Sequence, residues 1–463
     1  MGGAEGEAGL GLTRQIGDFI AALAPGDVPE AAWATIRAGF TDCVAVMTAG
    51  WKEPAVAVAR RSVAAEDSGW AAMLDGRTAA TEAALLLGTA AHVLDFDDTG
   101  LSGHPSAVLV PAILAEARET GCDGRMMALA YLAGYEVWAE LIGRDRDSHH
   151  AKGWHPSAVF GTLAAMAASA VLRRLDAPTA TRATGIAASF AGGVVANFGS
   201  MTKPYQLGRA VQAGLSAVRL AEAGLTAAPD AIEHDLGFLR AISPKGVVDT
   251  TTPARLGQDW HILRTGLNVK LYPVCYAAHR VLDAVGGLCR EYDIHAADIA
   301  AVDLTVGAGQ AAMLREHAPR TPLEAKFSAE FAVACMAVAR RCGLEELSEA
   351  FLARPELRAL FPLVHVHTVE GRNPDEPSLS PSDRVIITLH DGRVLDSGPV
   401  SFPRGHFRTP AGPEELHRKF LGCTRPEIGE AEAARLFALL QHIDSLGGVR
   451  DLLPAAAPLQ GAA

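Results

Sequence analysis

The pentapeptide His-Pro-Ser-Ala-Val occurs twice in this chain, at residues 104–108 and 155–159. Proline fits the first turn of a helix, because its missing N–H would have no helical partner there. A long apolar run follows each copy, so we expect His104 and His155 each to stand at the start of a helix. A helix N-terminus favours a nearby anion, and an imidazole can move protons near neutral pH. The repeat therefore predicts proton-transfer chemistry on a small anionic substrate.

Carboxylates and lysines elsewhere in the chain could complete such a site. Asp95 opens the acidic segment Asp-Phe-Asp-Asp-Thr and could orient a histidine or a lysine. Lys203 and Lys270 stand among small or apolar residues with a proline close behind, and a lysine can bind a carboxylate as a point charge. The predicted catalytic residues are Asp95, His104, His155, Lys203 and Lys270.

The chemistry expected of these residues is removal of a proton from a carbon beside a carboxylate or imine. The resulting carbanion needs fixed positive charge, and the acid–base groups must lie within hydrogen-bond reach. We expect His155 to be the principal acid or base and His104 to be its partner. Elimination also needs an acid for the leaving hydroxyl, whereas epimerisation needs a proton returned to the opposite face. The sequence does not choose between the two reactions.

Helices must position most of these residues. Apolar residues recur with helical spacing from Leu12 to about Arg264 and again in the tail. Between them, segments such as 301–306 and 384–389 alternate as strands do, and Asp391-Gly392 predicts a hairpin. We predict a mainly α fold with a large all-helical domain and a smaller α+β lid domain. The predicted bounds are 1–269 and 403–463 for the helical domain, and 270–402 for the lid.

Composition and charge indicate which binding partners and which cellular location to expect. The net charge of -12 argues against nucleic acid. The 7 cysteines contain no Cys-x-x-Cys pair, and residues 1–12 lack the basic start and apolar run of a signal peptide, so we expect a reducing, cytoplasmic location. Two uncharged stretches, 155–172 and 183–202, approach the length of a membrane span. We interpret both as buried helices and expect no membrane association.

Several motifs taken together resemble the MmgE/PrpD family. The acidic segment at 95–99 is followed by His104-Pro105-Ser106, and the later motifs follow in order from about residue 15 to 445. These later motifs are Lys152-Gly153-Trp154-His155-Pro156, Thr202-Lys203-Pro204, and Lys270-Leu271-Tyr272-Pro273 with His279. The resemblance implies a homodimer with a metal-free, cofactor-free site between a helical domain and a lid. It also implies that Asp95, Thr99, His104, His155, Lys203 and Lys270 form that site, with Cys275 lining it.

The family includes 2-methylcitrate dehydratase, cis-aconitate decarboxylase and iminodisuccinate epimerase, and this chain departs from the motifs in three places. The loop before His104 is one residue shorter than in the decarboxylase, with Gly100 where an aromatic residue is common. Gln206 replaces a histidine, and Phe331 replaces a tyrosine whose phenol could donate a proton. The predicted substrate-binding residues are Thr99, Cys275, Gln206, Phe331 and His279.

The missing phenol makes decarboxylation less favoured. We therefore predict a hydro-lyase similar to 2-methylcitrate dehydratase, with a dicarboxylate epimerase as the alternative. Two other classes stay open. Asp97 and Asp98, with the site histidines and Asp95, could ligate a metal, although no tight histidine–carboxylate spacing supports this. The chain could also be a dimer that binds a metabolite without turning it over.

Overall fold

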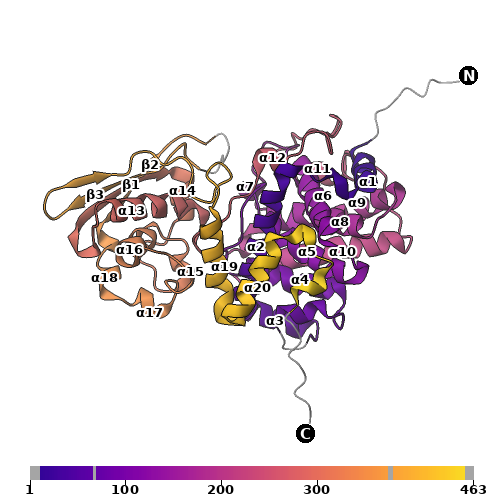
Figure 1. Ribbon diagram of the computed structural model, residues 1–463. Helices are drawn as coiled ribbons and strands as arrows, with labels where there is room; N and C mark the ends of the chain where they lie inside the picture. The colour runs from indigo at the N-terminus through magenta and orange to yellow at the C-terminus, as the bar shows by residue number, and fades with distance from the viewer. Residues whose placement is uncertain (1–10, 66–68, 374–378, 454–463) are drawn as a thin grey trace, which may run out of the picture. The chain divides into compact units, whose positions relative to one another are not determined.

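The computed structural model describes residues 11–65, 69–373 and 379–453. They divide into two compact units, Met1–Leu267 with Cys423–Ala463, and Asn268–Gly422. The fold is mainly α, as predicted, with one small sheet in the second unit (Figure 1). The N-terminal segment 1–10, on which the expected lack of a signal peptide largely rests, lies outside the described residues.

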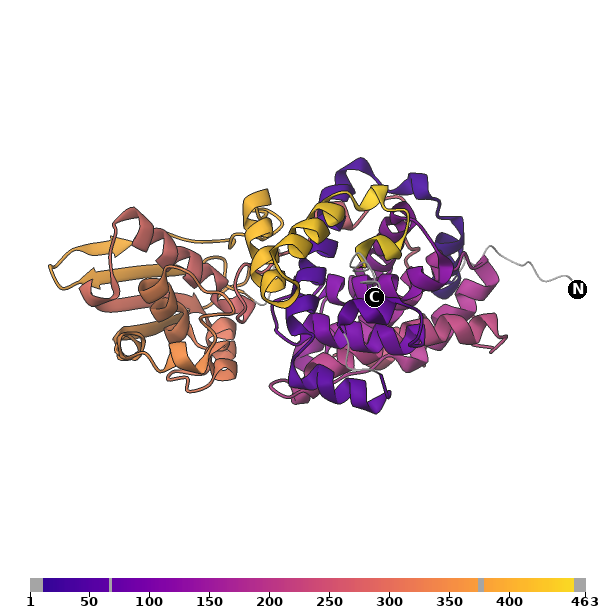
Figure 2. The same ribbon diagram turned by 60° about the horizontal axis from the view of Figure 1, so that its bottom comes forward.

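The larger unit consists of helices joined by loops of varied length. Its longer helices are α1 (Leu12–Ala22), α2 (Trp33–Gly50), α3 (Pro54–Ser62), α4 (Ala80–His92), α5 (Pro105–Thr120), α6 (Gly124–Ile142), α8 (Pro156–Leu172), α9 (Ala177–Phe190), α10 (Thr202–Glu222) and α20 (Glu430–Gln441). Its short helices are α7 (His149–Lys152), α11 (Phe238–Ile242) and α12 (Ile262–Thr265). Near the end of the chain, α20 returns to pack on α2, as the views in Figures 1 and 2 show.

Close helix packing holds the centre of this unit. Every residue of α8 is buried, and α8 packs against α5, α6 and α10. Glycines let α10 approach its neighbours. A Cβ at Gly208 would lie 2.3 Å from the Leu85 carbonyl oxygen of α4, and one at Gly214 would lie 2.6 Å from the Met166 nitrogen of α8. Helices α5, α8 and α10 therefore share a densely packed core.

The two uncharged stretches have different structures. Residues 155–172 form the buried helix α8 with its N-cap, as predicted. The prediction for 183–202 is wrong as a single buried helix, because α9 ends at Phe190 and Gly192 and Gly193 follow in a partly exposed loop. No helix in the described part of the chain has the length and apolarity that a membrane span requires.

The smaller unit contains a four-stranded sheet in the order β2-β1-β3-β4. Its strands are β1 (Ile299–Gly307), β2 (Val364–Val369), β3 (Arg384–Leu389) and β4 (Val394–Asp396). β2 lies parallel to β1, whereas β3 is antiparallel to both β1 and β4. The hairpin between β3 and β4 turns at the predicted Asp391-Gly392, where Gly392 has a φ of 89°. Val302, Leu304 and Val306 alternate into the core of this unit.

Helices α13 (His279–Glu291) and α16 (Ala329–Ala339) pack against the strands of this sheet (Figure 1). The shorter helices of the unit are α14 (Ala308–Met313), α15 (Pro322–Ala325), α17 (Glu349–Leu352) and α18 (Pro355–Arg358). Helix α19 (Pro413–Ile428) contains the boundary at Gly422. We expected residues from 403 onward to join the helical unit, but 403–422 groups with the smaller one.

Specific contacts account for the position of that boundary. The Arg404 guanidinium contacts Asp283 at 2.9 Å and the Tyr272 hydroxyl at 2.6 Å. The Val269 N–H donates to the Gly405 carbonyl at 2.8 Å. These bonds join the segment after residue 402 to the residues that open the smaller unit. No hydrophobic periodicity in the sequence reports such contacts.

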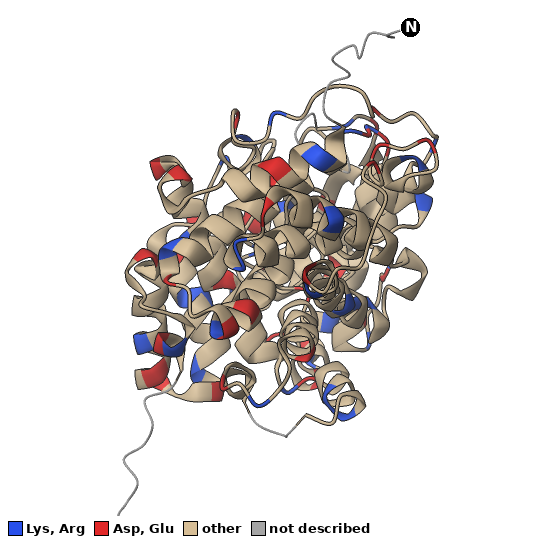
Figure 3. Ribbon diagram, turned by 90° about the vertical axis from the view of Figure 1, so that its right-hand side faces the viewer, with Lys and Arg blue, Asp and Glu red and all other residues tan. Residues whose placement is uncertain are grey.

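Charged residues lie mainly around the periphery of the helical unit. On the face shown in Figure 3, basic and acidic residues are interspersed and the central helices are mostly uncharged.

Candidate active site

Both copies of the pentapeptide start a helix, as predicted. His104 is the N-cap residue of α5 and His155 is the N-cap residue of α8, with a proline at the first helical position of each. The copies also contact each other, because the His104 backbone N–H donates to the Ser157 hydroxyl at 3.1 Å. The repeated sequence thus brings two imidazole-bearing helix N-termini together.

The loop from α4 to α5 has an unusual backbone. Asp95, Leu101 and Ser102 have φ values of 55°, 50° and 57°, in the left-handed region that non-glycine residues rarely adopt. Such conformations persist where the surroundings impose them, and they cluster at functional sites. Because α4 ends at His92, Asp95 and Asp98 do not share the helical face that a longer helix would have given them.

A buried carboxylate joins two imidazoles at this loop. Asp97 Oδ2 lies 2.8 Å from His92 Nδ1 and 3.0 Å from His104 Nδ1. His104 Nδ1 is also 2.8 Å from the Asp98 backbone carbonyl. The side chains of His92 and Asp97 are fully buried, whereas His104 keeps 14% of its side-chain surface exposed. His104 is therefore the member of this group that solvent or substrate can reach.

These contacts determine which ring nitrogen of His104 carries the proton. A carboxylate and a carbonyl can only accept hydrogen bonds, so the Nδ1 that faces both must be the N–H. In the neutral ring Nε2 then keeps its lone pair and can accept a proton. The same reasoning makes Nδ1 the protonated nitrogen of His92. His104 is thus held in the tautomer whose Nε2 is free of the ring proton.

Burial and charge favour this protonation pattern. Burial lowers the pKa of His92 to about 4, and nearby Lys203 adds to the shift. Burial opposes ionisation of Asp97, but the imidazoles of His104 and His92 outweigh it and hold the pKa of Asp97 well below its usual value. The group therefore consists of an ionised carboxylate that accepts from two imidazole N–H groups.

Lys203, a predicted site residue, places its positive charge beside Asp95. It is the second residue of α10, and its Nζ lies 2.9 Å from Asp95 Oδ1. The ammonium also lies 5.0 Å from the centre of the Phe198 ring, within the range of a cation–π contact. The same ring meets His155 edge-on at 4.9 Å. Lys203 and His155 therefore both contact the ring of Phe198. The side chains of Asp95 and Lys203 keep 14% and 13% of their surfaces exposed.

His155 has a different environment from His104. Its ring stacks on His92 with a centroid separation of 5.5 Å, while His104 meets His92 at 4.5 Å. Its Nδ1 lies 2.8 Å from the Gln206 amide nitrogen. Burial, with His92 and Lys203 nearby, holds the pKa of His155 far below its usual range. His155 is thus a neutral imidazole, bonded through Nδ1 to Gln206, which the sequence predicted as a substrate-binding residue.

Asp98, the residue after Asp97, provides a second buried carboxyl group near the histidines. Asp98 Oδ1 accepts from the Ser106 N–H at 3.2 Å, and the Ser106 hydroxyl is 2.7 Å from the Tyr131 hydroxyl. Burial, followed by repulsion from the nearby carboxylate of Asp42, raises the pKa of Asp98 to about 8. Asp98 is therefore mostly protonated at neutral pH and places no second charge beside Asp97. Thr99, next in the chain, has a buried hydroxyl with no hydrogen-bond partner among the described residues.

Four of the predicted site residues lie in the smaller unit. Lys270 is buried with 2% exposure, and Cys275 is partly buried. Phe331 is fully buried in the hydrophobic core of its unit, and His279 packs between the rings of Tyr272 and Tyr276. Substrate contact by Phe331 and His279 stays a prediction. Roles for Lys270 and Cys275 in the site stay predictions.

Sequence reasoning missed three residues that contact the predicted ones. His92 ends an apolar helix, and Asp97 was considered only as a metal ligand, although together they orient His104. Phe198 lies in a glycine-rich loop and contacts both Lys203 and His155. The available hint for His92 was its place three residues before the acidic segment. Nothing in the sequence marked Phe198.

Among the described residues, His92, Asp97 and His104 present ligand atoms that all lie within 4.8 Å of one another. This set could hold a metal ion. The N···O separations of 2.8 and 3.0 Å are also ordinary hydrogen-bond lengths. The hydrogen bonds satisfy both Nδ1 atoms without a metal.

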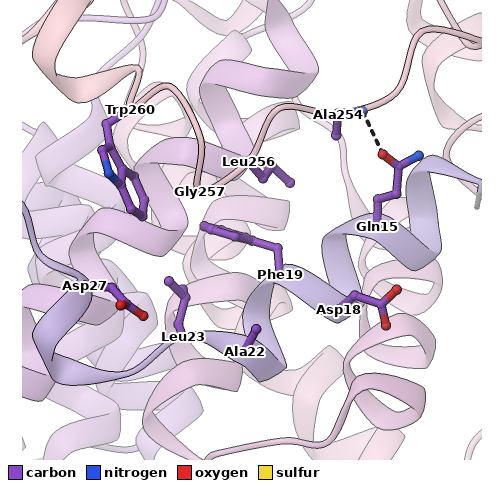
Figure 4. Close-up of a pocket in the computed structure, with 10 residues that line it drawn as sticks. All are labelled: Gln15, Asp18, Phe19, Ala22, Leu23, Asp27, Ala254, Leu256, Gly257 and Trp260. Carbon is purple, nitrogen blue, oxygen red and sulfur yellow. Dashed lines mark hydrogen bonds between the residues drawn. The ribbon is translucent and has the colours of Figure 1, made fainter.

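A separate hollow of about 620 Å³ lies between α1 and the loop before α12 (Figure 4). Phe19 and Trp260 face it, and Gln15 accepts a hydrogen bond from the Ala254 N–H at 2.7 Å. Its only charged lining residues among those described are the carboxylates of Asp18 and Asp27. A carboxylate substrate would be repelled there, so the histidine site fits the expected ligand and this hollow does not.

Comparison with known proteins agrees with the motifs. The model of the MmgE/PrpD N-terminal domain matches residues 14–250, and that of the MmgE/PrpD C-terminal domain matches residues 272–444. The chain is 26% identical over 385 residues to cis-aconitate decarboxylase of Homo sapiens, covering 80% of this chain and 78% of that protein. It is 28% identical over 387 residues to the Mus musculus protein of the same name, covering 80% and 77%. Cis-aconitate decarboxylase of Aspergillus terreus is 25% identical over 484 residues, covering 97% and 96%.

Proposed function

The chain belongs to the MmgE/PrpD family and is an enzyme, and we propose that it is a lyase acting on a small di- or tricarboxylate. The reaction that we favour begins with removal of a proton from the carbon beside a carboxylate. The observation that carries this proposal is the arrangement around His104. Its Nδ1–H is held by buried Asp97, so its Nε2 is the accepting atom of a partly exposed ring.

His104 acts as the base in this proposal. When Nε2 takes the proton from carbon, the ring becomes a cation that donates through Nδ1 to the ionised carboxylate of Asp97. A charge-assisted hydrogen bond is worth about 1.5–3 kcal/mol, more than its neutral equivalent. Asp97 therefore stabilises the state that follows proton transfer. His92 donates to the same oxygen of Asp97 and keeps it in place.

The substrate carboxylates bind to positive charge at the site. An ammonium has three N–H donors, and Asp95 accepts one of those of Lys203. The N-termini of α5, α8 and α10 carry partial positive charge where His104, His155 and Lys203 stand, which favours an anion. Lys270 would supply a second cation, as the family motif implies. No step in this scheme draws on a metal or a cofactor.

Elimination of water is the finer reaction that we favour. The C–H electron pair forms the new C=C bond as the C–O bond breaks, and the leaving hydroxide takes the proton that His104 Nε2 received. Atoms and charge then balance with one residue acting first as a base and then as an acid. Epimerisation would need a second group to return a proton to the opposite face of the carbon. The rings of His104 and His155 both pack against the ring of His92. This arrangement favours proton removal and proton return on the same face of the substrate.

Decarboxylation is the second candidate, because the relatives described above are named cis-aconitate decarboxylases. Loss of CO₂ leaves a carbanion that must gain a proton. His104 would deliver to it a proton that Nε2 had taken from solvent, so that charge balances. The two reactions share a carbanion beside a carboxylate and differ in the leaving group.

Incubation with a panel of di- and tricarboxylates, followed by NMR, tests the proposal. The panel contains 2-methylcitrate, citrate, cis-aconitate and a chiral dicarboxylate. A new alkene with retained carboxylates would support the hydro-lyase, and CO₂ release would support the decarboxylase. Loss of optical activity without an alkene would support an epimerase. Binding of these acids without turnover of any of them would contradict the proposal of a lyase.

A further inference from the structure

Gln206 is the only hydrogen-bond partner of the His155 ring among the described residues, and backbone contacts fix its orientation. The Val194 N–H donates to Gln206 Oε1 at 3.1 Å, so that atom must be the amide oxygen. The amide nitrogen then faces the Val194 carbonyl at 3.3 Å and His155 Nδ1 at 2.8 Å. The opposite placement of the amide would put its NH₂ group against the Val194 N–H. The amide group of Gln206 therefore donates to His155.

The loop that carries Val194 is held in place independently. The His155 N–H donates to the Gly193 carbonyl, and the Val195 N–H donates to the Gly153 carbonyl at 2.9 Å. These bonds pair the segment before α8 with the segment before α10. Gln206 lies in α10, which packs along α8. The Gln206–His155 contact is therefore set by two helices and by a pair of bonded backbone segments.

We propose that Gln206 holds His155 as a neutral imidazole with its proton on Nε2, so that His155 donates a hydrogen bond to a substrate oxygen. An amide N–H that points at Nδ1 requires a lone pair there, and the ring proton must then be on Nε2. His155 Nε2 is buried and has no hydrogen-bond partner among the described residues, and the whole residue is only 2% exposed. A buried donor left unsatisfied costs about 1–3 kcal/mol. A substrate oxygen would remove that cost.

This assignment rests on the proposed function and differs from the principal-base role expected from the sequence. His104 and His155 are fixed in opposite tautomers, one by Asp97 and the other by Gln206. His104 accepts the proton. His155 keeps its own proton and stabilises negative charge that develops on the carboxylate as the carbon loses its proton. Nearby Lys203 and burial disfavour a cationic His155, which agrees with a donor that stays neutral throughout.

The residue at position 206 therefore sets the tautomer of His155. Glutamate at this position would keep the length of the side chain and the acceptor for the Val194 N–H, but it could not donate. Its carboxylate would draw the proton to His155 Nδ1, leaving Nε2 as a lone pair or making the ring cationic. Gln206→Glu therefore converts His155 from a donor to an acceptor at its substrate-facing nitrogen. Gln206 is a positioning residue, because it acts through His155.

The first test measures the tautomer directly, without substrate. Protein labelled with ¹⁵N in its histidine rings gives separate long-range ¹H–¹⁵N signals for each nitrogen, and His155→Asn identifies those of His155. We expect wild-type His155 to have a protonated-type Nε2 and an unprotonated-type Nδ1 throughout the pH range of activity. Gln206→Glu should reverse the two or show both protonated. A wild-type Nδ1–H would overturn the inference, whatever the enzyme turns over.

The second test measures the consequence for catalysis. Removal of one donor to a developing oxyanion costs about 10²–10³-fold in kcat, so Gln206→Glu should lose about that much with little change in its melting temperature. The matched control is Gln212→Glu, which makes the same change six residues further along α10 beside Arg209 and should leave kcat unchanged. His155→Gln keeps a donor and should retain more activity than His155→Leu.

The results separate the two proposals. Equal losses in the Gln and Leu variants of His155, or wild-type kcat in Gln206→Glu, would contradict the donor role. No turnover of any panel acid, with the expected tautomer intact, would contradict the proposed function and leave only the tautomer assignment standing.

Discussion

Replacement of Asp97 by asparagine should separate the orientation of His104 from substrate binding. The carboxylate oxygen that accepts from both His92 and His104 becomes part of a neutral amide. If the amide oxygen takes its place, both hydrogen bonds weaken from about 1.5–3 to about 0.5–1.5 kcal/mol. If the NH₂ group takes its place, it competes with the Asp98 carbonyl for His104 Nδ1 and favours the tautomer with the proton on Nε2. In the first case the protonated base loses its counter-charge, and in the second it can no longer accept a proton.

The expected loss in kcat is about 10²–10⁴-fold, the usual contribution of a general acid or base. An Asp→Asn change that leaves an imidazole in the wrong tautomer costs about 10⁴-fold in serine proteases, which sets the upper end. KM should change little, because Asp97 is fully buried and contacts the histidines rather than the substrate. Steady-state kinetics on the substrate that the panel identifies would measure both constants.

A matched control makes the same chemical change where no chemistry is expected. Asp176 caps α9 by accepting from the Thr179 N–H, and asparagine caps a helix about as well. Asp176→Asn should therefore leave kcat and the melting temperature almost unchanged. Thermal unfolding shows whether Asp97→Asn is folded at the assay temperature. A folded Asp97→Asn enzyme with kcat within a few-fold of wild type would refute the assignment of His104 as an oriented base.

Three further outcomes follow from the site. Lys203→Ala should lower kcat/KM by about one to two decades, the equivalent of about 1.5–3 kcal/mol for a charge-assisted contact, and near-normal kcat/KM would remove Lys203 from the site. Asp98 has its pKa raised to about 8, so its stabilising contribution is present below its unfolded pKa and is lost as pH rises toward 8. Asp98→Asn should therefore unfold at a higher temperature than wild type. The difference in free energy of unfolding between the two proteins should grow with pH by up to about 1.4 kcal/mol per pH unit. A difference that does not change with pH would contradict a buried, neutral Asp98. EDTA should leave kcat unchanged, whereas a loss that added Zn²⁺ restores would show that His92, Asp97 and His104 hold a metal.

The sequence predicted the parts of this site that depend on local backbone chemistry. Pro105 and Pro156 mark the helix starts, so the places of His104 and His155 could be inferred. The acidic segment and the Lys203 motif identified the ion pair's two members, although not their contact.

The remaining features depend on how distant segments fold together. His92 and Asp97 meet because the loop after α4 turns back on itself through residues with positive φ. The meaning of Gln206 depends on the Val194 backbone, which orients its amide. Phe331 and His279 were placed at the site by motif, and only packing shows that they lie in the core of the smaller unit. The lid role of that unit stays a prediction.

Carbon-bound deuterium tests the central claim most directly. The EDTA-treated enzyme is incubated in D₂O with the acid that it turns over, and NMR follows the carbon beside the carboxylate. Wild type should exchange hydrogen for deuterium at that carbon, and His104→Gln should exchange at least about 10²-fold more slowly. His104→Gln keeps a side chain that can hydrogen-bond but cannot shuttle a proton. Exchange at the wild-type rate in His104→Gln would contradict the account, as would a reaction that wild type brings to equilibrium in D₂O with no label at that carbon of the saturated acid.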